Sequence, residues 1–206
     1  EDGTGNFTYF FPPGLAKNEK YDWQLPEAAT IHAQGNGKAL ATLDSLNVNY
    51  IVDPVVDLNF AVTAGNVDTT FTISTAVMPF SALTNPNAYA TAAVTVTDLN
   101  QNGASIDGLL DSDKIYQAIA NGTAWASLVD SFTVAPYDSE IGKERMPAVA
   151  PNWGTIAGSV SSIQSQFSFT LSAYDSASAT SHFEVVPEPA TLALLGVGGL
   201  WLRKRK

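Results

Sequence analysis

The sequence predicts an all-β protein: an antiparallel β-sandwich or jelly roll with one short helix, followed by a hydrophobic helix at the C-terminal end. Three observations predict this class. Apolar and polar side chains alternate over short runs, clusters of Gly, Asn, Asp and Pro separate those runs, and only 15% of the residues are charged. About eight to ten strands are expected, as in a single sandwich domain.

The clearest strand pair is predicted between residues 57 and 77. Leu58, Phe60 and Val62 alternate with polar or small residues, and the alternation resumes from Phe71 to Val77 after Ala64-Gly65-Asn66. Gly and Asn tolerate the positive φ of a tight turn, so these residues predict a hairpin. Weaker alternation predicts further strands at residues 7–11, 39–52, 92–97, 127–134, 166–173 and 181–186.

Two stretches depart from the alternation. The short helix is predicted after Asp111-Ser112-Asp113, which offers capping side chains, because Ile115 and Ile119 form an i,i+4 apolar pair and Asn121-Gly122 supplies a stop. Residues 136–153 hold three prolines and a cluster of charges, so a long loop is expected there.

Charge and composition exclude several functions. Residues 1–186 carry six basic and nineteen acidic residues, a net charge of −13, which repels nucleic acid phosphates. The chain has no cysteine, so disulfides, thiolate metal sites and cysteine nucleophiles are excluded. His32 and His182 stand in no catalytic or metal-ligand motif, and we expect no enzyme. Carboxylates paired only by folding remain the alternative.

The C-terminal residues differ sharply from the rest of the chain. After a domain at residues 1–186, a tail at 187–206 has three parts in order. These are Pro187, Glu188 and Pro189, an uncharged apolar run from Ala190 to Leu202, and the basic residues Arg203, Lys204, Arg205 and Lys206. As a helix the apolar run would reach about 20 Å, against a hydrocarbon core of roughly 30 Å. It therefore predicts a transient membrane tether with a cytoplasmic basic end. A buried C-terminal helix is the alternative.

This tail resembles a known family signal. Val186-Pro187-Glu188-Pro189-Ala190-Thr191, the Leu/Gly-rich run and the basic end resemble the PEP-CTERM sorting signal of Gram-negative bacteria. The resemblance covers the tail alone. It implies export, processing by an exosortase-type enzyme, attachment to the inner membrane before processing, and a setting rich in exopolysaccharide. Because the sequence opens at Glu1 without Met, either a signal peptide was removed, as the tail favours, or the sequence begins within a longer precursor.

Two sets of residues in the domain at residues 1–186 suggest binding sites. Asp98, Asn100 and Asn102 place oxygens at alternate positions before a glycine, as in a calcium loop, and Asp107, Asp111 or Asp113 could complete a different cage. The twelfth position is Leu109, where an EF-hand has Glu, and an ordinary turn is the alternative.

Aromatic residues suggest the second site. Trp23, Trp125 and Trp153 would stack against sugar rings if they shared one exposed face, although such residues more often pack in cores. The tail is the main basis for predicting a structural or adhesive protein of the cell surface or extracellular matrix. The alternatives are a carbohydrate-binding module and a subunit that assembles with copies of itself into a filament or layer.

Overall fold

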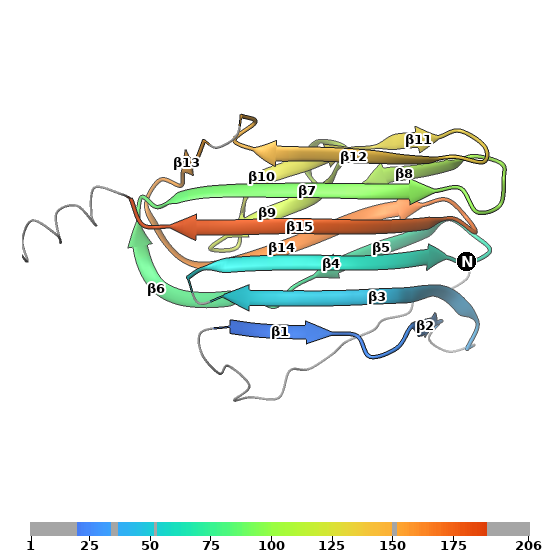
Figure 1. The fold of residues 1–206 in the computed structure, drawn as a ribbon, viewed down its shortest axis with the longest axis horizontal. Coiled ribbons are helices and arrows are strands. Elements are labelled where there is room, and N and C mark those ends of the chain that lie inside the picture. The colour runs from blue at the N-terminus through green and yellow to red at the C-terminus, as the bar shows by residue number, and fades with distance from the viewer. Residues whose placement is uncertain (1–19, 34–36, 52, 150–151, 189–206) are drawn as a thin grey trace, which may run out of the picture.

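The computed structural model describes residues 20–33, 37–51, 53–149 and 152–188. They form two antiparallel sheets that pack face to face, with the strands of sheet A along the long axis of the molecule (Figure 1). The prediction of an all-β protein is confirmed.

Sheet A contains, in spatial order, β1 (Lys20–Gln24), β3 (Ala39–Ile51), β4 (Val55–Ala64), β15 (Ser176–Val186), β7 (Asn87–Thr97) and β12 (Ser139–Met146). β2 (Ala29–His32) also pairs with β3, and β13 (Gly154–Thr155) also pairs with β7. Sheet B contains β10 (Thr123–Asp130), β9 (Lys114–Ala120), β14 (Ser159–Leu171), β8 (Ala104–Gly108) and β11 (Phe132–Val134), while β5 (Thr69–Ser74) and β6 (Met78–Thr84) also pair with β14. The described residues thus form fifteen strands, more than the eight to ten expected.

The core lies between the two sheets and follows from the alternation. Along β4, Leu58 and Phe60 are buried, whereas Asp57 and Asn59 point outward and are half-buried. Phe60 meets Phe167 of β14 edge to face, with ring centroids 5.1 Å apart. Period-two alternation therefore gives sheet A one apolar inner face and one polar outer face.

A buried hydroxyl also bridges the core. Tyr116 of β9 is fully buried, and its hydroxyl lies 3.0 Å from the Ser165 hydroxyl. Burial raises the pKa of Tyr116 to about 12, although its hydrogen bonds to Ser165 and Ser181 act in the opposite direction. Because Ser181 belongs to β15, this tyrosine connects sheet B to sheet A through a satisfied polar contact.

The predicted hairpin between residues 57 and 77 is wrong. Both strands exist, but β4 pairs with β3 and β15 in sheet A, while β5 pairs with β14 in sheet B. Residues 65–68 therefore form a corner between the sheets. Alternation shows that each strand has one apolar face. Two successive strands bury these faces equally well whether they belong to one sheet or to two facing sheets.

The predicted short helix is also wrong. A single 3₁₀ turn at Asp111–Asp113 leads into strand β9, and β9 forms a hairpin with β10. Ile115 and Ile119 share a face in a strand as well as in a helix, because four is a multiple of two. Asn121 and Gly122, with φ of 48° and 76°, supply the two-residue turn of the hairpin.

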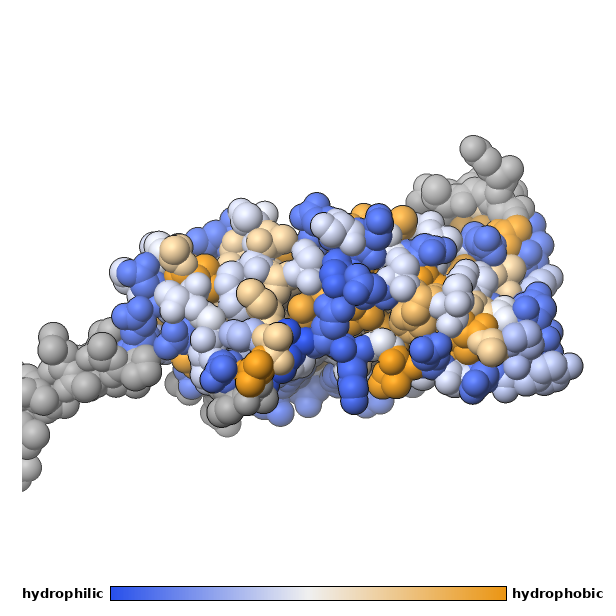
Figure 2. Space-filling view, turned by 90° about the horizontal axis from the view of Figure 1, so that it is seen from above, coloured by the Kyte–Doolittle hydropathy of each residue, from blue (hydrophilic) through white to orange (hydrophobic). Residues whose placement is uncertain are grey.

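The predicted loop at residues 136–153 contains a strand instead. β12 forms the edge of sheet A and carries Glu140, Lys143, Glu144 and Arg145. Figure 2 views the molecule from above, the side of β12 in Figure 1, and shows a hydrophilic band across its middle. Charges suit an edge strand because they discourage pairing with another chain. A cluster of charges therefore does not distinguish a loop from an edge strand.

An ion cluster closes the sandwich beside this edge. The Lys114 Nζ atom lies 3.0 Å from Asp130 Oδ1 and 3.1 Å from Glu144 Oε2, which joins β9, β10 and β12. The strand predicted at residues 7–11 and the predicted C-terminal helix lie outside the described residues. Within the residues that are described, no helix has the length and apolar character needed to cross a membrane.

Candidate functional site

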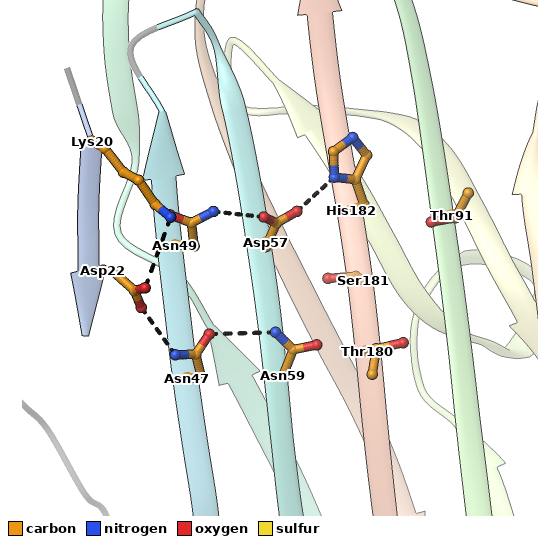
Figure 3. A pocket seen from close by; sticks show the side chains of 10 residues that line it. All are labelled: Lys20, Asp22, Asn47, Asn49, Asp57, Asn59, Thr91, Thr180, Ser181 and His182. Carbon is orange, nitrogen blue, oxygen red and sulfur yellow. Dashed lines mark hydrogen bonds and ion pairs between the residues drawn. The ribbon is translucent and has the colours of Figure 1, made fainter. Parts of the chain in front are cut away.

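The outward side of sheet A, which we name the polar face, holds an open pocket of about 340 Å³ (Figure 3). It is lined by Lys20, Asp22, Asn47, Asn49, Asp57, Asn59, Thr91, Thr180, Ser181 and His182. These residues come from five neighbouring strands, β1, β3, β4, β15 and β7. The pocket therefore extends across the strands.

One row of hydrogen bonds crosses the pocket at His182. Asn49 donates from Nδ2 to Asp57 Oδ2 over 2.8 Å, and Asp57 Oδ1 lies 2.6 Å from His182 Nδ1. The other ring nitrogen, Nε2, lies 3.2 Å from Glu184 Oε2. The strand register places Asn49, Asp57, His182 and Thr91 side by side on consecutive strands.

A second row lies one step along the strands. Asn47 donates from Nδ2 to Asp22 Oδ1 over 3.1 Å, and Asn59 donates from Nδ2 to Asn47 Oδ1 over 3.5 Å. Asn59 is paired in register with Thr180 of β15. Both rows arise because every second residue of β3, β4 and β15 points outward.

The two carboxylates beside His182 favour its charged form. Burial alone would lower the pKa of His182, but the hydrogen bond and charge of Asp57, followed by those of Glu184, raise it above its ordinary value. Burial would likewise raise the pKa of Asp57, but hydrogen bonds from His182 and Asn49 hold it below its ordinary value. When it is protonated, His182 donates from both ring nitrogens and offers no lone pair.

These shifts predict how stability depends on pH. Because the folded-state pKa of His182 lies above 6.5, its stabilising contribution is complete below about pH 6.5 and is lost as the pH rises through the folded-state pKa. Because the pKa of Asp57 lies below 3.8, its contribution is complete above about pH 4 and is lost as the pH falls through the folded-state pKa.

Urea unfolding of the wild type and of His182→Gln, measured from pH 3 to pH 9, tests this prediction. Between about pH 4 and 6.5, the free energy of unfolding of the variant should be about 1 kcal/mol lower than that of the wild type. This difference should shrink at lower and at higher pH. A difference that is constant across the whole range would contradict the prediction.

An aromatic group borders the pocket. The Tyr89 ring lies 4.9 Å from the His182 ring and 4.7 Å from the Trp153 ring, and the Arg145 guanidinium carbon lies 5.6 Å from the Tyr89 centroid. Burial, followed by the charge of Glu184, raises the pKa of Tyr89. This side of the pocket is therefore a packed aromatic wall.

Several polar groups in the pocket have no partner among the described residues. Asn49 Oδ1 is shielded from solvent and accepts no hydrogen bond there, and the described residues supply none to the hydroxyls of Thr91 and Thr180. The hydroxyls of Thr91 and Thr180 line the pocket and can exchange hydrogen bonds with hydroxyl groups of a ligand, whereas a ligand reaches the shielded Asn49 Oδ1 atom only if this side chain moves.

The three tryptophans that would stack against sugars if they shared one exposed face lie apart in the structure. Trp125 of β10 stacks on buried Phe183, with ring centroids 5.7 Å apart, and so packs into the core. Trp23 lies on β1 in register with buried Val48. Trp153 borders the polar face at Tyr89. The structure therefore brings only Trp153 to the pocket's aromatic wall.

The predicted calcium residues form a tight turn between β7 and β8. The Asp98 carboxylate accepts hydrogen bonds from the backbone N–H groups of Gln101, Gly103 and Tyr137 at 2.7 to 3.1 Å. Burial would raise the pKa of Asp98, but these backbone donors hold it below its ordinary value.

The other members of the predicted calcium set are also placed in the turn or nearby. The Asn100 amide donates to the Ala173 carbonyl and accepts from the Asn102 N–H, and Asp107 lies on β8 opposite Thr170. Within the described ranges, no three His, Asp or Glu side chains gather as a metal site would need. The calcium site stays a prediction.

Reasoning from the sequence missed the polar pocket. The available signal was the presence of Asn, Asp and His at outward positions of β3, β4 and β15, where Thr and Ser are the usual residues of a solvated strand face. Asp57 and His182 are 125 residues apart, so their contact depends on the order of the strands in the sheet.

Comparison with solved structures finds distant likenesses. The structure of infectious bursal disease virus Gx strain is 9% identical, covers 96% of this chain and 70% of that chain, and has a TM-score of 0.26. The enzymatically active domain of tailspike protein 4 from Bacteriophage CBA120 is 10% identical. The match covers 82% of this chain and 20% of that chain, with a TM-score of 0.21. At these TM-scores neither protein informs the fold or function of this chain. No curated protein matches the sequence.

The C-terminal residues match a family model. β15 ends at Val186, and Pro187 and Glu188 follow it directly, whereas the predicted membrane run and basic end lie outside the described residues. A model described as the PEP-CTERM protein-sorting motif matches residues 185–206, which confirms the resemblance found in the sequence. This motif marks a protein that is exported and sorted by a C-terminal signal. The chain is therefore an exported all-β protein with a PEP-CTERM sorting motif in its tail.

Proposed function

We propose that this exported protein has an adhesive role at the cell surface or in the extracellular matrix, and that its polar face binds a neutral polysaccharide. The observation that carries the proposal is the pocket on sheet A, in which polar side chains from five strands converge. An exosortase-type enzyme would process the tail, and the inner membrane would hold the protein until then.

The chemistry of the pocket suits sugar hydroxyl groups, which both donate and accept hydrogen bonds. The amides of Asn47, Asn49 and Asn59 carry donors and acceptors, and Thr91 and Thr180 add hydroxyls. Positive charges on Lys20 and His182 are balanced by nearby carboxylates. A neutral ligand with many hydroxyls therefore fits this pocket better than an ionic one.

The shape of the site suits an extended chain. Two parallel rows of side chains run across β3, β4 and β15 (Figure 3). The Tyr89 ring lies beside the row that contains His182, 4.9 Å from the His182 ring. Because neighbouring strands lie about 4.8 Å apart, such rows offer polar groups at regular intervals to a repeating polymer. Adhesion through many weak contacts follows from this arrangement.

A binding role accounts for His182 better than a catalytic one. Asp57 and Glu184 each engage one ring nitrogen of His182, so neither nitrogen is left to remove a proton from a substrate. The same contacts pair both carboxylates with one imidazole. We therefore propose that these residues shape and rigidify the pocket.

Assembly with copies of this chain through edge strands has less support. β12 is an edge strand of sheet A, and Lys143 and Arg145 stand on its outward side. Charges on an edge strand oppose pairing between copies. Light scattering without added polysaccharide tests this alternative, which predicts polymers that grow with protein concentration.

Replacing Asn59 by Ala is expected to weaken polysaccharide binding about tenfold. The substitution removes a hydrogen bond and leaves the sugar hydroxyl without its partner, which costs about 1.4 kcal/mol. Affinity electrophoresis through dextran, a soluble β-glucan and a galactomannan measures retention of the full chain. The wild type should be retarded by at least one polymer, and Asn59→Ala should be retarded less.

The matched control is Thr95→Ala, which alters an outward residue of β7 that does not line the pocket. It should bind as the wild type does. Equal retardation of all three proteins would place binding away from the pocket, and no retardation by any polymer in a broad panel would refute the proposed ligand class.

A further inference from the structure

The sorting tail leaves the folded domain at one end of the sandwich. Val186 is the last residue of β15 and is paired with Asn87 of β7, and Asn87 is also paired with Thr155 of β13. Val185 is fully buried, and its N–H donates to the Pro54 carbonyl. β13 and the end of β15 lie together at the left of Figure 1. We name this the tail end.

The chain between the domain and the apolar run is very short. Three residues lie between Val186 and Ala190, and these four peptide steps limit the distance between the two Cα atoms to about 14 Å. Pro187 and Pro189 restrict this connection further, because each fixes its own φ. The sorting motif matched at residues 185–206 thus begins inside β15.

Apolar side chains are exposed at the same end. Met146, Val149 and Trp153 are 42%, 64% and 40% exposed, and they lie at or between the end of β12 and the start of β13. Lone exposed apolar residues are ordinary, but here three follow one another on a connection beside the exit of the tail.

Contacts anchor the described residues on both sides of this connection. Arg145 donates from Nη2 to the Asn152 carbonyl over 3.5 Å, and its guanidinium lies over the Tyr89 ring. The Asn152 N–H donates to the Val149 carbonyl over 3.0 Å. Trp153 packs edge to face on Tyr89. The apolar side chains are therefore displayed from a fixed position.

We propose that the tail end of the sandwich rests on the lipid surface while the tail is in the membrane, with Met146, Val149 and Trp153 in the interfacial layer. The inference goes beyond polysaccharide binding and rests on the short tether and the position of these side chains. Transfer of valine and methionine side chains out of water lowers the free energy, and tryptophan favours the membrane interface. Tethering keeps the effective concentration high, so weak contacts are enough.

The contact is apolar in origin. The body carries a net charge of −13 at residues 1–186, which opposes approach to an anionic surface. The proposal therefore expects contact with a zwitterionic lipid surface, which needs no charge attraction. It also sets an orientation, because the strands of sheet A then run away from the membrane and the loop that holds Tyr174 lies at the far end (Figure 1).

Single labels on the full chain test the proposal, and the absence of cysteine makes each label unique. We would label Val149→Cys, Tyr174→Cys and Leu195→Cys with the environment-sensitive dye nitrobenzoxadiazole and reconstitute each protein in phosphatidylcholine vesicles. Leu195 lies within the apolar run and reports insertion of the tail, while Tyr174 is 54% exposed and provides the matched control. Circular dichroism confirms the β-fold of each variant.

The proposal expects a blue shift and a several-fold rise in emission at positions 149 and 195, with neither at position 174. A response at 195 without one at 149 would refute the contact and leave the tether intact. Responses at both 149 and 174 would refute the orientation. No response at 195 would refute the tether and the contact together. The polysaccharide assay with Asn59→Ala is independent of all these outcomes.

Discussion

Replacing Phe167 by Ala is expected to lower the free energy of unfolding by about 3–5 kcal/mol. Phe167 lies on β14, is fully buried and contacts rings on two other strands. Its centroid is 5.1 Å from that of Phe60 and 4.8 Å from that of Tyr116. Truncation removes the apolar contacts of both rings and leaves a cavity at the centre of the sandwich. Urea unfolding followed by circular dichroism measures the change.

Two further variants distinguish a core effect from a general effect of substitution. Phe167→Leu keeps much of the apolar volume and should cost less than Phe167→Ala. Leu99→Ala alters a side chain that is 53% exposed, and it should change stability by no more than about 0.5 kcal/mol. If Phe167→Ala were as stable as Leu99→Ala, the packing of β14 against β4 described above would be wrong.

Replacing Gly108 by Ala is expected to destabilise the protein by about 3 kcal/mol, because the new methyl group meets backbone. A Cβ atom at this position would lie 2.3 Å from the Asp113 carbonyl oxygen and 2.5 Å from the Lys114 carbonyl carbon. Gly108 also donates its N–H to Ser131 Oγ and pairs with Phe169 in sheet B. The clash must therefore displace either β8 or the start of β9. Thermal and urea unfolding measure the loss.

Gly122→Ala is the matched control for this prediction. A Cβ atom at Gly122 would have no neighbour within 4 Å, but the φ of 76° is unfavourable for alanine. The expected cost is about 1 kcal/mol from backbone strain alone. A smaller loss in Gly108→Ala than in Gly122→Ala would mean that the turn from β8 into β9 is looser than described.

The contrast between these glycines shows what local sequence can reveal. Asn121-Gly122 between alternating residues is a hairpin signal that can be read without knowing the fold. Gly108 carries no such signal, because its requirement comes from the close approach of residues 113 and 114 after the chain reverses. Similarly, Ile115 and Ile119 fit either a strand or a helix, and only the pairing of β9 with β14 decides between them.

Taken alone, the sequence determined two properties of this protein. Its short alternating runs require sheets with one buried face, because only such sheets remove every second side chain from water. The order of proline, apolar and basic residues after Val186 determines the sorting tail, because it is a linear signal that does not depend on which strands of the domain pair. Both are encoded in residues that are neighbours along the chain.

The tertiary structure decided which strands pair and therefore which polar residues meet. Asp57 was predictable as an outward residue of its strand, but its contact with His182 arises because β15, added last among the described strands, inserts between β4 and β7. The same insertion places the tail exit beside β13 and Trp153. Such contacts depend on the order of strands in space, which alternation cannot specify because every strand presents the same two faces.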